Sequence, residues 1–188
     1  QLIRREKIDL VIDLHEAELQ YPVISTIVVH PKGQDLAALA SMTISAEEGF
    51  DIGVEYSPEA LHGLSHREIG DWTDAIPLLM ETPEPFLDAT RGKTDRDLLL
   101  SGRDEFVMKA GQHGLLFEKL DERGWPIDVR VGRHLSSIAV ILKTWSELRP
   151  DRLIEAEEIP HYSEIVEKTT GFYLKNPAEA PANRLFFE

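Results

Sequence analysis

Two short segments of the chain place side chains suited to metal-dependent hydrolysis where apolar runs end. The first is Asp13-Leu14-His15-Glu16, in which a His flanked by carboxylates follows an aliphatic run, and the second is Glu81, which follows another. A neutral imidazole is a good zinc ligand, and a nearby carboxylate can orient it or act as a base on metal-bound water. The residues alone equally allow a structural alternative, with His15 a hydrogen-bonded strand-end residue and Glu81 an exposed carboxylate.

Alternating strands and helices must position these residues. Apolar runs predict strands over residues 8–14, 23–29, 50–56 and 75–80. Spacings of three and four predict helices over residues 34–48, 94–113 and 126–148. Because two prolines follow it, Glu81 is expected at the carboxyl end of the last strand. We therefore predict an α/β fold with a mixed, mostly parallel sheet flanked by helices, and with ligands at the carboxyl ends of its strands.

Two further segments complete this prediction. Residues 57–74 begin as a loop with many polar groups, and such loops often carry function. Residues 151–188 are expected to form an extension with a short strand over 153–159, a helical turn after Pro160 and a tail. The C-terminal part is thus predicted to be a mixed helical and strand extension.

The composition excludes several classes of function. The 188 residues include 20 Lys and Arg against 34 Asp and Glu, and this net charge of −14 argues against nucleic acid or an anionic membrane as partner. With no Cys, the chain has neither a thiolate metal site nor a Cys nucleophile, so a metal must be held by His and carboxylates. No apolar run approaches the roughly 20 residues that span a bilayer, and the first residues do not resemble a signal peptide. We expect a cytoplasmic protein.

The stretch from Ile8 to Pro85 resembles the zinc carboxypeptidase superfamily, in particular its succinylglutamate desuccinylase/aspartoacylase branch. Asp13-Leu14-His15 resembles the motif that carries the third zinc ligand of this family. Glu81 follows His15 by 66 positions, with two predicted strands and one helix between, where the family places its catalytic Glu. The resemblance implies a zinc carboxypeptidase-like fold in which His15 binds Zn2+ and Glu81 is the general base.

The resemblance also assigns a role to Arg67. Members of the branch place an Arg before the catalytic strand, where its guanidinium pairs with a substrate carboxylate, and Arg67 is the matching residue. The alternative is an ion pair with Glu68 or Asp71, and the sequence leaves both open.

The family's other motifs are missing. The upstream His-x-x-Glu and the Asn-Arg pair are absent, so the chain offers one zinc ligand where three are needed, and we expect it to be the C-terminal portion of a longer protein. A competing placement reads His15 to Glu18 as His-x-x-Glu with His134 as third ligand. We set it aside because His134 lies in a predicted helix beside Arg133, where a solvated or packed His is usual.

These observations predict a zinc-dependent hydrolase that cleaves an amide bond of a small N-acyl amino acid or short peptide. Residues 1–90 would form the C-terminal part of its α/β domain, 91–150 two helices packed on that domain, and 151–188 the extension. One alternative is a metal-free hydrolase-like binding or scaffold domain, and a weaker one is a metal-free ligand site in residues 62–72. The two long helices would either cover the sheet or form a subunit interface. The sequence therefore allows both a monomer and a homo-oligomer.

Overall fold

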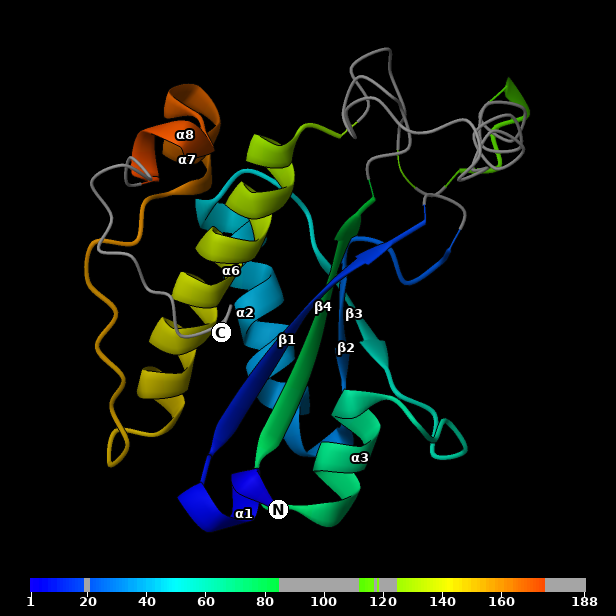
Figure 1. Ribbon diagram of the computed structural model, residues 1–188, viewed down its shortest axis with the longest axis vertical. Coiled ribbons are helices and arrows are strands. Elements are labelled where there is room, and N and C mark those ends of the chain that lie inside the picture. The colour runs from blue at the N-terminus through cyan, green and yellow to red at the C-terminus, as the bar shows by residue number, and fades with distance from the viewer. Residues whose placement is uncertain (19–20, 85–111, 117, 119–124, 175–188) are drawn as a thin grey trace, which may run out of the picture.

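A four-stranded mixed sheet lies at the centre of the computed structural model, which describes residues 1–18, 21–84, 112–116, 118 and 125–174 (Figure 1). Its strands are β1 (Leu10–Ala17), β2 (Thr26–Val29), β3 (Gly53–Tyr56) and β4 (Ile76–Pro83). They are arranged in the order β1-β4-β2-β3. The pairs β1/β4 and β2/β3 are parallel, whereas β2 and β4 are antiparallel. The predicted α/β fold with a mixed, mostly parallel sheet is confirmed.

Both strands of the candidate site are longer than predicted. β1 continues past His15 to Ala17, and β4 continues past Glu81 to Pro83. The two strands pair in parallel over all eight residues, and Pro83 lies opposite Ala17. On its other side β4 pairs with β2 only as far as Met80. Pro83, which has no backbone N–H to donate, therefore lies where no second ladder needs one.

The helices of the described residues surround this sheet. They are α1 (Leu2–Glu6), η1 (Pro31–Gly33), α2 (Gln34–Glu47), α3 (Ser65–Trp72), α6 (Ile127–Leu148), α7 (Tyr162–Lys168) and α8 (Thr170–Tyr173). The predicted helices that became α2 and α6 are confirmed, whereas the one predicted over 94–113 lies almost wholly outside the described residues. No described helix has both the length and the apolar character needed to cross a membrane.

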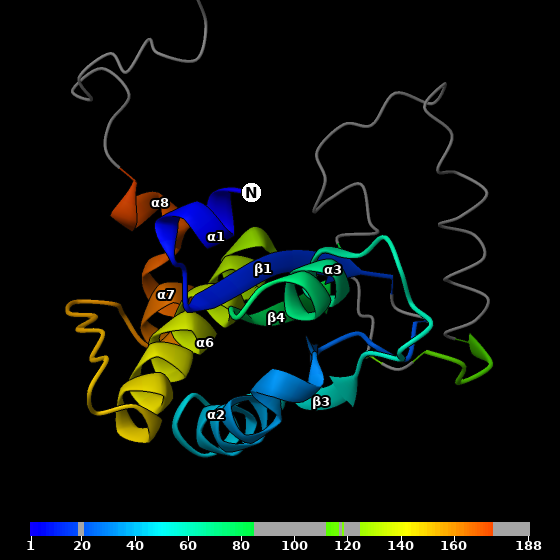
Figure 2. The same cartoon turned by 90° about the horizontal axis from the view of Figure 1, so that it is seen from below.

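One face of the sheet carries the main core. Alternate residues of β4, namely Ile76, Leu78 and Met80, pack with the buried apolar residues of α2 and α6. Figure 2 shows both helices lying on this side of β1 and β4. By the same alternation Leu79 and Glu81 point to the opposite face, and their partners Asp13 and His15 on β1 point there with them. The candidate site therefore lies on the face away from α6.

Two local predictions were wrong. Residues 65–72 form the helix α3 instead of a loop, and one face of this helix packs against β4. The buried residues of this face, His66, Arg67 and Gly70, are not large apolar residues, so the face does not appear as an apolar pattern in the sequence. Residues 153–159 form no strand: the N–H and carbonyl of Ile154 both bond to the hydroxyl of Ser146 on α6, and this exposed segment has no strand partner. The helical part of the predicted C-terminal extension is present as α7 and α8.

Gly70 allows α3 to approach the end of β2 closely, and Gly70→Ala should destabilise the fold by about 1–3 kcal/mol. A Cβ at this position would lie 2.3 Å from Cγ of His30. The His30 ring is held by Asp71, with Nε2 3.1 Å from Oδ1, so it cannot move aside without losing this contact. Urea unfolding measures the effect. Gly171→Ala is the control, because the new Cβ would lie 3.7 Å from Oγ1 of Thr169, an ordinary contact distance. Equal stability of the two variants would contradict the prediction.

Candidate active site at the carboxyl ends of β1 and β4

His15 and Glu81 are brought together by the pairing of β1 with β4. They are register partners in the parallel ladder, so their side chains leave the same face of the sheet side by side. This end of the two strands lies at the top of the sheet in Figure 1. The structure thus places the predicted metal ligand and the predicted general base in one site.

Asp13 and Ser65 support the His15 side chain. Nε2 of His15, which is about half exposed, lies 3.3 Å from Oδ2 of Asp13, two residues earlier on the same face of β1. Ser65, the first residue of α3, donates its hydroxyl to the same carboxylate oxygen. A carboxylate in this position fixes the orientation of an imidazole.

Glu81 is a partly buried carboxyl group with an unusual proton affinity. Burial raises the pKa of Glu81 to about 7, and the carboxylates of Asp13, Glu84 and Glu16 act in the same direction, whereas His15 opposes them. Its Oε2 atom is buried and has no hydrogen-bond partner within the described ranges. A carboxyl group whose pKa lies near neutrality can accept a proton and release it again under ordinary conditions, as a general base requires.

The described residues do not by themselves form a zinc site. A zinc site in a hydrolase needs three protein ligands, such as two His and one Glu. In the part of the chain that the structure describes, no three His, Asp or Glu residues are grouped closely enough to hold a metal ion. The competing set of His15, Glu18 and His134 is therefore not formed, and His134 contacts the backbone carbonyl of His15. A zinc ion on His15 would need ligands from outside the described residues.

Arg67 forms the ion pair that the sequence left open as an alternative. Its side chain is buried, and Nε and Nη2 donate to the two carboxylate oxygens of Asp71 at 2.8 and 2.7 Å. Nη1 lies 3.4 Å from the carbonyl oxygen of Ser57. These hydrogen bonds hold the pKa of Asp71 below its usual range. For Arg67 to bind a substrate carboxylate bidentately, the guanidinium would first have to leave Asp71.

A buried polar layer extends from the site along α3. His66 is almost fully buried, and its Nε2 lies 3.0 Å from the hydroxyl of Ser57. Burial lowers the pKa of His66, and the charge of Arg67 acts in the same direction, so the ring is neutral near pH 7. His30 completes the layer through its contact with Asp71. These residues set the position of α3, and through Ser65 the position of Asp13.

The contact between Asp13 and His15 agrees with the sequence pattern, in which a carboxylate beside His15 could orient its ring. Sequence reasoning missed the approach of His134 to the site. No sequence signal marks this contact, because His134 comes from a helix more than one hundred residues later and the contact depends on how α6 packs.

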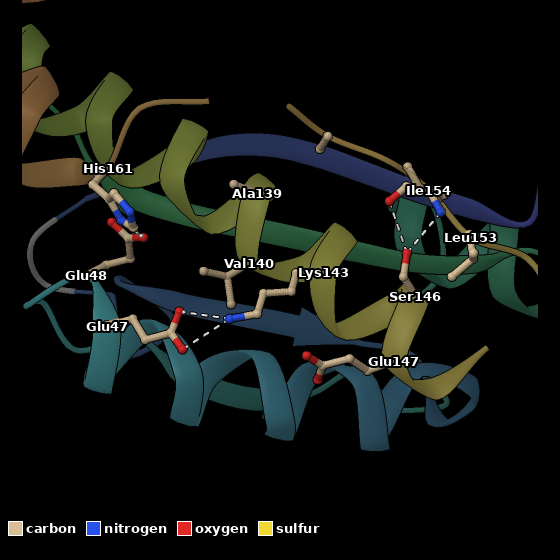
Figure 3. A pocket seen from close by; sticks show the side chains of 11 residues that line it. Glu47, Glu48, Ala139, Val140, Lys143, Ser146, Glu147, Leu153, Ile154 and His161 are labelled. Carbon is tan, nitrogen blue, oxygen red and sulfur yellow. Dashed lines mark hydrogen bonds and ion pairs between the residues drawn. The ribbon is translucent and has the colours of Figure 1, made fainter. Parts of the chain in front are cut away.

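A separate pocket of about 510 Å3 lies between α2, α6 and the segment after α6 (Figure 3). Three carboxylates, from Glu47, Glu48 and Glu147, line it, and no lining residue comes from β1 or β4. Nζ of Lys143 lies 3.2 Å from Glu47, and Nδ1 of His161 lies 2.9 Å from Glu48. Two of the three carboxylates are thus neutralised or bound within the protein, and the pocket contributes nothing to the His15 and Glu81 site.

Comparisons of the chain with protein-family models, curated proteins and solved structures found no match.

Proposed function

We propose that the protein is a hydrolase that cleaves an amide bond in a small N-acyl amino acid or a short peptide, with Glu81 as the general base. One observation supports this most directly: a partly buried carboxyl group whose pKa is raised to about 7 lies in register with His15 at the carboxyl ends of two parallel strands. Carboxyl ends of parallel strands are where α/β folds bind their ligands.

In the proposed reaction Glu81 first accepts a proton and then donates it. Its carboxylate takes a proton from a water molecule as the water oxygen attacks the carbonyl carbon of the amide. The protonated Glu81 then gives this proton to the departing nitrogen as the carbon–nitrogen bond breaks, which yields a carboxylic acid and an amine. A pKa near 7 suits both steps, since the group must be ionised for the first and protonated for the second.

Zn2+ is the proposed cofactor, with His15 as one of its ligands and Asp13 holding the His15 ring. We also propose a cytoplasmic location, because the sequence shows neither a signal-peptide pattern at its first residues nor an apolar run long enough to span a bilayer. The absence of a three-ligand group among the described residues favours the second candidate function, a metal-free binding or scaffold domain. The two candidates differ in measurable zinc content and in turnover.

Zinc content and amine release from the full-length protein test the proposal. We expect about one zinc per chain by elemental analysis, release of amine from at least one member of a panel of N-acyl amino acids and dipeptides, and loss of both in His15→Ala. Glu55→Gln, on the exposed part of β3, is the control and should retain both. A protein with neither zinc nor turnover would overturn the hydrolase and leave the binding or scaffold domain.

A further inference from the structure

His134 reaches the candidate site from the far side of the sheet. It lies on α6, which packs on the face opposite to the side chains of His15 and Glu81. Its Nε2 atom is 3.1 Å from the backbone carbonyl oxygen of His15 and 3.1 Å from the hydroxyl of Thr82, the residue after Glu81. One ring nitrogen therefore contacts β1 and β4 at the level where the two site residues pair.

The chemistry of these two contacts determines the tautomer of His134. A carbonyl oxygen can only accept a hydrogen bond, so Nε2 must carry the proton and donate it. Burial lowers the pKa of His134 to about 4, and the ring is therefore neutral near pH 7 with a single N–H. The Nδ1 atom is left buried and without a hydrogen-bond partner among the described residues.

A residue selected only for packing would not have these properties. Leu or Met would fill similar space on α6 without burying an unpaired nitrogen, which is unfavourable. What His134 adds is a donor that ties the backbone of β1 to the side chain of Thr82 on β4. Thr82 is itself almost fully buried, so its hydroxyl has little access to water in place of this contact.

We propose that His134 is a positioning residue for the amide hydrolysis proposed above, and that it acts by fixing the carboxyl ends of β1 and β4 against α6. It touches neither the substrate nor the reacting atoms. By holding the His15 carbonyl and Thr82 in place, it sets how far the His15 ring lies from the Glu81 carboxyl group. This inference rests on the proposed function, and the experiment below separates the two.

Three variants of the full-length protein test the role. His134→Leu keeps the approximate volume and removes the donor, His134→Gln restores an N–H donor of similar reach, and Val140→Ala removes buried volume elsewhere on α6. Because small misplacements of reacting groups have large effects on rate, we expect His134→Leu to lower kcat by roughly ten- to hundredfold with little change in KM. His134→Gln should recover most of the loss, and Val140→Ala should retain kcat even if its stability falls further.

Amide hydrogen exchange provides a readout that needs no substrate. In His134→Leu, exchange should accelerate at His15, Glu16 and Thr82 while the amino-terminal halves of β1 and β4 keep their protection, and His134→Gln should restore the wild-type pattern. Uniform acceleration over the sheet, or a kcat for His134→Leu equal to that of Val140→Ala, would overturn the positioning role. An unchanged rate in Glu81→Gln would instead overturn the proposed function, so the two failures are distinguishable.

Discussion

Replacing Glu81 with Gln is expected to lower the turnover of amide substrates by about 10²- to 10⁴-fold, the usual contribution of a general base. Gln has nearly the same shape as Glu but cannot accept a proton from water. The partly buried site and its pairing with His15 should be retained, because the register of β1 and β4 depends on their backbones. Steady-state kinetics with any substrate found in the amine-release panel measures the effect.

Two further measurements make this prediction specific. Zinc content and KM should change little in Glu81→Gln, since Glu81 is assigned neither to the metal nor to substrate binding. Glu55→Gln, a matched change on an exposed part of β3, should have the wild-type turnover. If Glu81→Gln turns over substrate at the wild-type rate, Glu81 is not the base and the assignment of the site fails.

The same substitution should change how stability depends on pH. Burial raises the pKa of folded Glu81 from 4.5 to about 7, so the folded state favours the protonated carboxyl group more than the unfolded state does. The stability that this group contributes is fully present below about pH 4.5 and is lost as the pH rises through about 7. Gln is neutral at every pH and undergoes no such loss.

Relative to the wild type, Glu81→Gln should therefore become more stable as the pH rises, by up to about 3 kcal/mol between pH 4 and pH 9. Urea unfolding of both proteins at several pH values in this range gives the difference directly, and it cancels the titration of all other groups. The difference should rise most steeply between pH 5 and pH 7. A constant difference would show that Glu81 titrates normally in the folded protein.

The strands of the sheet and the two candidate site residues, His15 and Glu81, could be predicted from sequence because their signals are local. Apolar residues mark each of the four strands, and the polar residues that end two of these apolar runs are His15 and Glu81. The runs do not reveal which strands are neighbours. That His15 and Glu81 lie side by side follows from the strand order, which is a property of the folded chain.

The missed elements have other physical causes. α3 was not recognised because its buried face carries His66 and Arg67, which are stabilised by Ser57 and Asp71 instead of by apolar contacts. The strand predicted over 153–159 was wrong because a strand needs a partner, and Ser146 on α6 binds this segment instead. In both cases the deciding contacts are made by polar side chains, so the spacing of apolar residues does not reveal them.

The antiparallel pairing of β2 with β4 determines which connecting segments lie near Glu81. Because β2 and β3 run opposite to β4, their carboxyl ends at His30 and Ser57 lie at the end of the sheet that is remote from Glu81. The segments that lead into β2 and β3, residues 21–25 and 48–52, lie at the same end of the sheet as Glu81. If the protein is the amide hydrolase proposed above, changes in these two short connections should alter its substrate preference, whereas changes around His30 and Ser57 should affect folding instead.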